Sequence, residues 1–163
     1  MAEASPPTPE TFDQVLDAAR AQRRTIVLTN GCFDVMHAGH AALLRAAAAQ
    51  GDFLAVGVND DAGVRALKGP RRPMAPLADR LALVAAVRWV DAITVFEELT
   101  ADALIRRVRP DVYVKGADYD VDAGGRELPE AATLHALDVR VVYVPLMSGR
   151  STSSLVERLR QEP

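Results

Sequence analysis

Two histidines three residues apart are the first side chains whose spacing fits a chemical task. His37 and His40 stand in the string HAGH, which includes Gly39. Residues three apart share a helix face, so both imidazoles can meet one ligand. Free N–H groups and the positive dipole end at a helix start attract phosphate, and glycine permits its close approach. The spacing predicts phosphate binding and transition-state stabilisation by both rings, although a helix-capping surface pair, with or without a metal ion, has the same spacing.

Lysine is rare in this chain, and both lysines are followed by glycine. Two of the 19 Lys and Arg residues are lysines, Lys68 and Lys115. Lys68 opens a Pro-rich stretch that also holds Arg71 and Arg72, and prolines lower the entropy lost when a loop becomes ordered. A basic loop that closes over anionic substrates has this composition. Lys68 is therefore predicted to contact phosphate, while Arg71 and Arg72 taken alone also fit a solvated charge run.

The composition excludes several other functions. The net charge of −3 and pI near 5.6 exclude binding to nucleic acid or anionic membranes through bulk positive charge. A single cysteine, Cys32, forms no internal disulfide, which predicts a reducing compartment. No apolar run approaches the roughly 18 residues that span a bilayer, and the Pro-rich start lacks a secretory pattern. We therefore predict a cytoplasmic protein with no nucleic-acid or membrane partner.

The elements that must position these residues alternate between strand and helix. The periodicity predicts strands at 26–28, 53–58, 92–96, 112–114 and 139–144. It predicts helices at 11–22, 38–50, 60–67, 77–87, 100–108, 127–137 and 151–159, with Thr11 and Thr100 as caps. This order predicts an α/β fold, a doubly wound parallel sheet of about five strands. Residues 1–10 are predicted to be a disordered lead-in, and residues 11–163 a single domain.

The loops that follow the strands are where a ligand is expected. Doubly wound sheets bind ligands beyond the carboxyl ends of their strands, near the point where the strand order reverses. These loops comprise residues 30–39, 59–61, 115–125 and 145–152. Both histidines of the HAGH string and Lys115 therefore belong to the same predicted edge of the sheet.

The segment from Thr29 to His40, TNGCFDVMHAGH, resembles the signature of the HxGH nucleotidyltransferases, the cytidylyltransferase-like family. Further strings follow in that family's order: GVNDD at 57–61, KGPRRP at 68–73, Arg80 with RWVD at 88–91, PDVYVKGADY at 110–119, and GRST at 149–152. The KGxxRP and VKGxDY strings are most similar to the branch that makes bacterial ADP-heptose. Together these strings cover roughly residues 25–160.

The resemblance implies a Rossmann-like fold and a reaction. A phosphate oxygen of the acceptor would attack the α-phosphorus of ATP, carried with Mg²⁺, and release pyrophosphate with no covalent enzyme intermediate. The acceptor it implies is a sugar 1-phosphate, foremost D-glycero-D-manno-heptose 1-phosphate. It also implies a homodimer and a separate sugar kinase that supplies this acceptor.

The resemblance also assigns roles to individual residues. The catalytic set is His37, His40 and Lys68. The nucleotide-binding set is Asn30, Gly31, Cys32, Phe33, Gly39, Lys115, Gly116, Asp118, Ser148, Gly149, Ser151 and Thr152. The acceptor-binding set is Asp34, Arg71, Arg80 and Arg88. Arg80 and Arg88 are eight residues apart and are predicted to lie near the same face of one helix. Simpler roles stay open for several of them: a helix cap for Asp34, surface ion pairs for Arg80 and Arg88, and packing for Cys32.

One departure from the family pattern bears on the nucleotide. Related cytidylyltransferases commonly begin an RTxGxST string with arginine, whereas this chain has Leu146 there and reads LMSGRST, which leaves Arg150 as the local charge. The departure argues against cytidylyl transfer. Two alternatives to the adenylyltransferase are nevertheless kept: a cytidylyltransferase acting on glycerol 3-phosphate or another phosphorylated acceptor, and a nucleotide-binding regulatory module without turnover.

Overall fold

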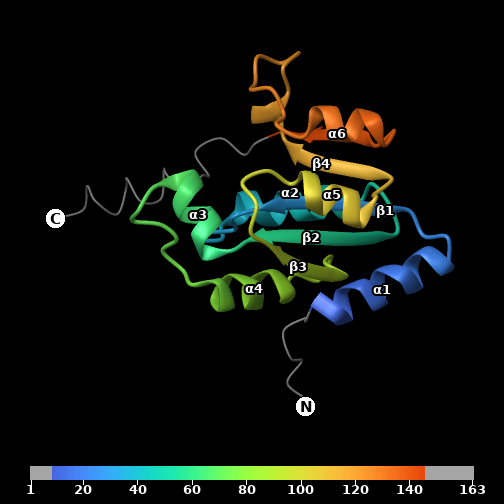
Figure 1. Ribbon diagram of the computed structural model, residues 1–163, viewed down its shortest axis with the longest axis horizontal. Coiled ribbons are helices and arrows are strands. Elements are labelled where there is room, and N and C mark those ends of the chain that lie inside the picture. Colours follow the sequence, from blue (N-terminus) through green and yellow to red (C-terminus); the bar gives the residue numbers. More distant parts are fainter. Residues whose placement is uncertain (1–8, 146–163) are drawn as a thin grey trace.

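The computed structural model describes residues 9–145, which form a parallel sheet with helices on both faces (Figure 1). The strands are β1 (Ile26–Gly31), β2 (Phe53–Asn59), β3 (Ala92–Phe96), β4 (Val112–Gly116) and β5 (Arg140–Val144). The helices are α1 (Pro9–Ala21), α2 (Ala38–Ala48), α3 (Asp61–Lys68), α4 (Leu77–Ala85), α5 (Asp102–Val108) and α6 (Ala131–Ala136), with a 3₁₀ turn η1 (Ala117–Tyr119). The predicted five-stranded α/β fold is confirmed.

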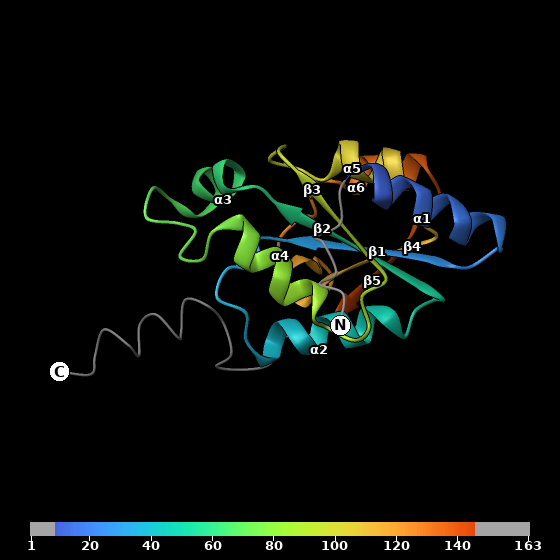
Figure 2. The ribbon, with the colours of Figure 1, turned by 90° about the horizontal axis from the view of Figure 1, so that it is seen from below.

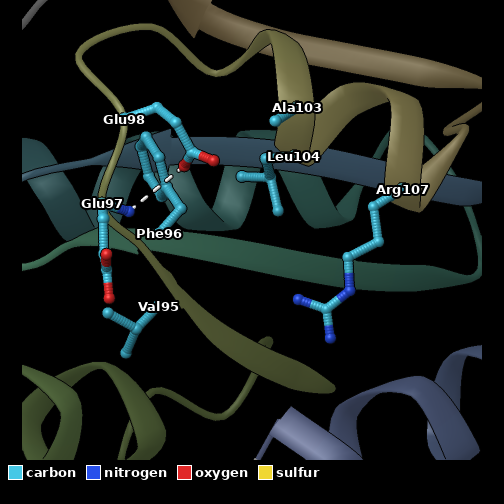
Figure 3. Close-up of a pocket in the computed structure, with 7 residues that line it drawn as sticks. All are labelled: Val95, Phe96, Glu97, Glu98, Ala103, Leu104 and Arg107. Carbon is cyan, nitrogen blue, oxygen red and sulfur yellow. Dashed lines mark hydrogen bonds between the residues drawn. The ribbon is translucent and has the colours of Figure 1, made fainter.

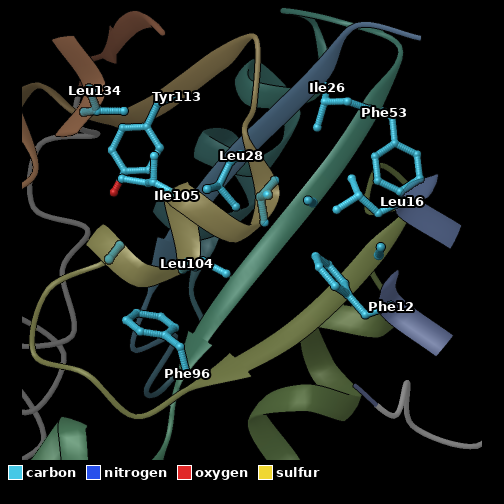
Figure 4. Packing of buried hydrophobic residues seen from close by; sticks show 14 of the residues in the cluster. Phe12, Leu16, Ile26, Leu28, Phe53, Phe96, Leu104, Ile105, Tyr113 and Leu134 are labelled. Carbon is cyan, nitrogen blue, oxygen red and sulfur yellow. The ribbon is translucent and has the colours of Figure 1, made fainter. Parts of the chain in front are cut away.

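Side chains of each strand alternate between two separate apolar layers. Leu28 of β1 packs with Phe12 of α1 and Ile105 of α5 on one face (Figure 4). Val27 of β1 packs with Leu44 of α2 on the other face, which α4 also covers (Figure 2). Because both faces are covered, the strands are apolar along most of their length, and every residue of β2 is buried.

The strand order places a switch point beside β1. The order is β3-β2-β1-β4-β5, and every pairing is parallel. The chain passes from β1 to β2 and β3 on one side, and then returns to β4 and β5 on the other. The carboxyl ends of β1 and β4 are thus neighbours, with Thr29 paired to Val114. A ligand site is expected at this position.

Several predicted boundaries and caps are wrong by a few residues. Helix α1 begins at Pro9, so the predicted cap Thr11 lies inside it. The N-cap of α5 is Ala101, whereas the Thr100 hydroxyl donates a 2.6 Å hydrogen bond to Asp102. Helix α6 begins four residues later than predicted, at Ala131. The pattern of apolar residues locates the elements, but tertiary packing decides where they end.

Both lysines lie inside elements rather than in the loops predicted for them. Lys68 is the last residue of α3, and Lys115 belongs to β4, which runs two residues beyond the predicted end. Residues 1–8 of the predicted lead-in and the predicted helix 151–159 lie outside the described part of the chain. No helix within residues 9–145 combines the length and the apolar character needed to cross a bilayer.

Gly57 of β2 marks a close approach between the sheet and α5. A methyl group at this position would overlap Cδ2 of Leu104 and lie 3.2 Å from Cβ of Asn30. Gly57→Ala is expected to lower the free energy of unfolding by about 1–3 kcal/mol through overpacking, as measured by chemical denaturation. Gly31→Ala is the control, because its nearest contact would be an ordinary 3.6 Å to the Phe33 ring. Equal stabilities of the two variants would contradict this assignment.

Candidate nucleotide-binding site

The loop between β1 and α2 has an unusual backbone that its own side chains hold. Phe33 and Val35 adopt left-handed conformations, with φ of 50° and 54°, which non-glycine residues rarely do. The Phe33 side chain is 2% exposed and packs in the apolar layer beneath α2. Such conformations persist only where the surroundings enforce them. Burial of Phe33 thus fixes the loop that leads to the histidines.

His37 and His40 together form the start of α2. His37 is the N-cap, and its Nδ1 accepts a 3.0 Å hydrogen bond from the backbone N–H of Gly39. Nδ1 of His40 accepts in return from the backbone N–H of His37, at 3.3 Å. The ring centres are 4.1 Å apart. Because Nδ1 of each ring is an acceptor, each neutral ring carries its proton on Nε2, which is the nitrogen left to donate to a ligand.

Burial keeps both imidazoles neutral. It lowers the pKa of His37, and it lowers the pKa of His40 to about 4. The neighbouring His37 lowers the pKa of His40 further, while Asp34 acts in the opposite direction. At pH 7 the two rings are therefore neutral N–H donors, and a bound phosphate would raise both pKa values.

Asp34 holds the loop that joins α3 to α4. Its Oδ2 accepts a 2.7 Å hydrogen bond from Arg72, and its Oδ1 accepts from the backbone N–H groups of Met74 and Ala75. Burial opposes ionisation of Asp34, but these hydrogen bonds outweigh it and lower the pKa of the carboxyl. Asp34 does not cap α2, because His37 does. Its predicted contact with the acceptor stays a prediction.

Arg80 and Arg88 are not on one helix, contrary to the prediction. Arg80 lies in α4 and is fully buried. Its guanidinium donates to the carbonyls of Cys32 and Asn59 at 2.6 and 2.7 Å, and to the Asp61 carboxylate at 2.7 Å. It therefore joins the ends of β1 and β2 to the start of α3, so a surface ion pair is the wrong description of it.

Arg88 follows the end of α4 and precedes β3, toward the opposite edge of the sheet. It is exposed, and its guanidinium lies 5.8 Å from the ring of Trp89. The next acidic residue, Asp91, accepts a hydrogen bond from the backbone N–H of Leu54 near the start of β2. The structure thus does not bring Arg88 together with the HAGH string.

Lys68 lies near the loop after β1, while Arg71 continues away from α3 as an exposed side chain. Burial raises the pKa of Cys32, and Lys68 is the charge that opposes this most strongly. The Cys32 thiol therefore stays protonated at neutral pH, and its Sγ donates to Oδ1 of Asn59 at 3.8 Å. This agrees with packing, rather than a reactive thiolate, as the role of Cys32.

The end of β4 adds a polar group to the same edge. The Tyr113 hydroxyl donates a 2.5 Å hydrogen bond to Oδ1 of Asn30 and so joins β4 to the end of β1. Lys115 follows on the same face of β4 and is 8% exposed. After Gly116, Asp118 of η1 forms a 2.8 Å ion pair with Arg126. The structure therefore brings Asn30 and Lys115 together with the β1 loop, whereas Asp118 is paired within its own loop.

Four predicted nucleotide contacts, Ser148, Gly149, Ser151 and Thr152, lie outside the described residues, as does Arg150. The hydrogen bond of Tyr113 to Asn30 was not predicted from the sequence, and the contact of Arg72 was left open. Tyr113 stands two residues before Lys115, so both side chains lie on one face of the strand. This spacing could have predicted that Tyr113 lies near the site. No comparable pattern in the neighbouring sequence indicates the ion pair between Arg72 and Asp34.

A cavity of about 250 Å³ lies elsewhere, over the edge of the sheet (Figure 3). Phe96 of β3 and Leu104 of α5 supply its apolar wall, and the side chains of Glu97, Glu98 and Arg107 extend around it. None of the predicted site residues lines it. Because β2 separates β3 from β1, this cavity is distinct from the site at the carboxyl ends of β1 and β4.

The five-stranded parallel sheet with helices on both faces defines a Rossmann-like α/β domain. The helix N-terminus and the two neutral histidines at its switch point are suited to an anionic ligand. Comparison with known proteins makes this class specific. The profile of the cytidylyltransferase-like family matches residues 28–158, and the chain belongs to this family.

The relatives include the bifunctional protein HldE of Streptomyces coelicolor, which is 47% identical over 152 residues, covering 92% of this chain and 32% of the relative. HldE of Pseudomonas entomophila is 44% identical over 146 residues, which cover 90% of this chain and 30% of that relative. The chain thus spans about a third of these relatives. A lipopolysaccharide core biosynthesis protein of Thermoplasma volcanium has a similar structure, with a TM-score of 0.61 and 26% identity, covering 76% of this chain and 97% of that one.

Loss of the buried guanidinium should destabilise the fold. Arg80→Met is expected to lower the free energy of unfolding by about 3 kcal/mol, because the carbonyls of Cys32 and Asn59 lose a charged donor in a buried position. Arg88→Met makes the same change at an exposed arginine and should alter stability by less than about 0.5 kcal/mol. Chemical denaturation measures both, and equal losses would contradict the structural role of Arg80.

The pKa of His40 can be measured by NMR titration of the histidine rings. In the ligand-free protein we expect a midpoint near pH 4, against an ordinary value of 6.5. Between these values the unfolded chain binds more protons than the folded one, so the free energy of unfolding falls as the pH is lowered from 6.5 toward 4. For this one ring, the free energy of unfolding falls by at most about 1.4 kcal/mol for each unit by which the pH is lowered.

His40→Asn should remove this part of the pH dependence. The exposed His135 gives a reference signal in the same spectra. A His40 midpoint near 6.5 would contradict the conclusion that burial lowers the pKa of this ring.

Proposed function

We propose that the chain is a nucleotidyltransferase domain that transfers an adenylyl group from ATP to a sugar 1-phosphate. The observation that carries the proposal is the paired capping of α2 by His37 and His40, which leaves Nε2–H of both rings as donors at the switch point of the sheet. Phosphoryl and nucleotidyl transfer depend mainly on positioning and on stabilising negative charge, and this arrangement can supply both.

In the proposed reaction, a phosphate oxygen of the acceptor attacks the α-phosphorus of ATP. The new P–O bond forms as the bond from the α-phosphorus to the oxygen bridging toward the β-phosphorus breaks, and pyrophosphate leaves with that electron pair. The attacking phosphate is already ionised, so no general base is needed. Nε2–H of His37 and of His40 donates to the phosphate oxygens as their charge increases, and Lys68 and Lys115 add positive charge from α3 and β4.

Mg²⁺ is proposed to arrive bound to the triphosphate, whose charge it neutralises. No group of three or more His, Cys, Asp or Glu side chains within residues 9–145 is arranged to hold a metal ion. Both Asp34 oxygens accept hydrogen bonds from the α3–α4 loop. Magnesium sites often use one or two carboxylates together with substrate phosphates, and this chain fits a metal held chiefly by the nucleotide.

Several observations support ATP and a sugar acceptor over the alternatives. The KGPRRP and VKGADY strings resemble the adenylyltransferase branch, and the relatives include proteins named as bifunctional HldE. The similar structure from Thermoplasma volcanium is named as a lipopolysaccharide core biosynthesis protein. D-glycero-D-manno-heptose 1-phosphate is the acceptor we propose first. The cytidylyltransferase acting on glycerol 3-phosphate has less support.

The wider setting is also a proposal. Relatives about three times as long as this chain are described as bifunctional, and a sugar kinase that supplies the acceptor is part of the proposal. A homodimer and a cytoplasmic location stay predictions. The proposed acceptor contacts of Asp34 and Arg71, and those of Ser148, Gly149, Ser151 and Thr152 with the nucleotide, are likewise part of the proposal.

A pyrophosphate-release assay tests the substrate assignment. The purified chain, with Mg²⁺, is combined with each of ATP, CTP, GTP and UTP and with a panel of sugar and polyol phosphates. We expect release with ATP and heptose 1-phosphate above all other pairs. Release with CTP alone would refute adenylyl transfer, and ATP binding without release for any pair would favour the regulatory module.

The same assay separates the histidine pair from an exposed histidine. His40→Asn should lower turnover by about 100-fold or more, since stabilising donors at a transition state contribute factors of this size. His135→Asn changes an exposed ring of α6 and should leave turnover unchanged. Circular dichroism checks that both variants are folded, and near-normal turnover by folded His40→Asn would exclude its proposed role.

A further inference from the structure

Lys115 is a buried cation at the carboxyl end of β4. Its side chain is 8% exposed, and Nζ lies 5.6 Å from the ring centre of Tyr113 and 5.2 Å from that of Tyr119. Across the described part of the chain, Lys115 forms no ion pair, and its Nζ donates no hydrogen bond. Aromatic faces attract an ammonium, but burial of a charge without an anion is costly.

Glu130 is a buried anion just before α6. It is 3% exposed, and its Oε1 accepts a 2.8 Å hydrogen bond from the backbone N–H of Ala101. Its Oε2 is buried and has no hydrogen-bond partner among residues 9–145. A carboxylate oxygen in this state retains its full capacity to stabilise a nearby positive charge.

Glu130 is the strongest acidic influence on Lys115. Burial lowers the pKa of Lys115, and Glu130 opposes that effect more than Asp118 does. Asp118 is itself paired with Arg126 at 2.8 Å. Two rings lie next to the Lys115 ammonium, Tyr113 from β4 and Tyr119 from η1. The titratable groups whose charges act on its pKa are Glu130, Asp118 of η1, Cys32 of the loop after β1, and Arg126 of the loop before α6. Glu130 is the one carboxylate of this set without an arginine partner.

We propose that Glu130 is a positioning residue, whose buried, unpartnered carboxylate oxygen keeps Lys115 charged beside the rings of Tyr113 and Tyr119 at the carboxyl end of β4. The role in binding rests on the proposed function, because Lys115 is there assigned to the phosphates of ATP. Glu130 acts through Lys115. The hydrogen bond that its Oε1 accepts from Ala101 connects Glu130 to the start of α5.

The composition of the chain makes a direct test possible. Because Lys68 and Lys115 are the sole lysines, protein labelled with ¹³C-lysine gives two side-chain signals, and Lys68→Arg assigns them. Glu130→Gln keeps an oxygen acceptor for the Ala101 N–H but removes the charge. We expect the titration midpoint of Lys115 to fall by about one pH unit or more in this variant, while that of Lys68 is unchanged.

Thr133→Val is the matched control at the same junction. The Thr133 hydroxyl donates to the Asp102 carboxylate and accepts from Arg106 at 3.0 Å, so this variant loosens the contact between α5 and α6 while Glu130 is retained. It should lower stability and leave the Lys115 midpoint where it was. An unchanged midpoint in Glu130→Gln, or an equal shift in Thr133→Val, would overturn the proposal.

ATP binding, measured by calorimetry across the alkaline pH range, tests whether the positive charge of Lys115 contributes to binding the nucleotide. We expect the pH at which affinity is lost to fall in Glu130→Gln by the same amount as the Lys115 midpoint. A shifted midpoint with unshifted ATP binding would overturn the role in binding. Because no turnover is needed, absence of pyrophosphate release would count against the adenylyl transfer alone.

Discussion

The buried guanidinium of Arg80 is the interaction on which the geometry of the site depends. Parallel strands end in carbonyl groups that no further strand partner satisfies, and here the carbonyls of Cys32 and Asn59 lie close together at the ends of β1 and β2. One planar cation with fixed donor directions can satisfy both and still reach the Asp61 carboxylate. Because α4 carries this cation, the position of the β1 loop is coupled to the packing of α4 on the sheet.

The site gathers positive charge locally in a chain that is acidic overall. The net charge is −3, and the two histidines are neutral before a ligand arrives, because burial lowers their pKa values. Neutral donors cost little to bury, whereas permanent cations would repel one another in the empty site. Attraction for an anion therefore increases as the anion enters and raises the proton affinity of the rings. The permanent positive charges nearby include Lys68 of α3, Lys115 of β4 and Arg80 of α4, whereas the charge of Arg72 is paired with Asp34.

How much of this structure can be predicted from the sequence depends on how far apart along the chain the interacting residues lie. Alternation of apolar strands and helices is a local pattern, and it located the sheet, the HAGH string at the start of α2, and the loop after β1. The shared helix of Arg80 and Arg88 was predicted wrongly, because α4 ends at Ala85. Burial of Arg80 depends on carbonyls 21 and 48 residues away along the chain. No pattern within α4 carries that information.

Arginine and lysine are used differently at the two most buried cationic positions, and the difference follows from their shapes. Arg80 meets three oxygen acceptors from separate elements, which requires a forked donor. Lys115 meets two aromatic rings and the field of one unpaired carboxylate oxygen, which suits a compact ammonium on an apolar stem. A guanidinium at this position would bring five N–H donors to a buried site that faces two aromatic rings. In a chain where arginine is the usual cation, this environment gives a physical reason for one of its two lysines.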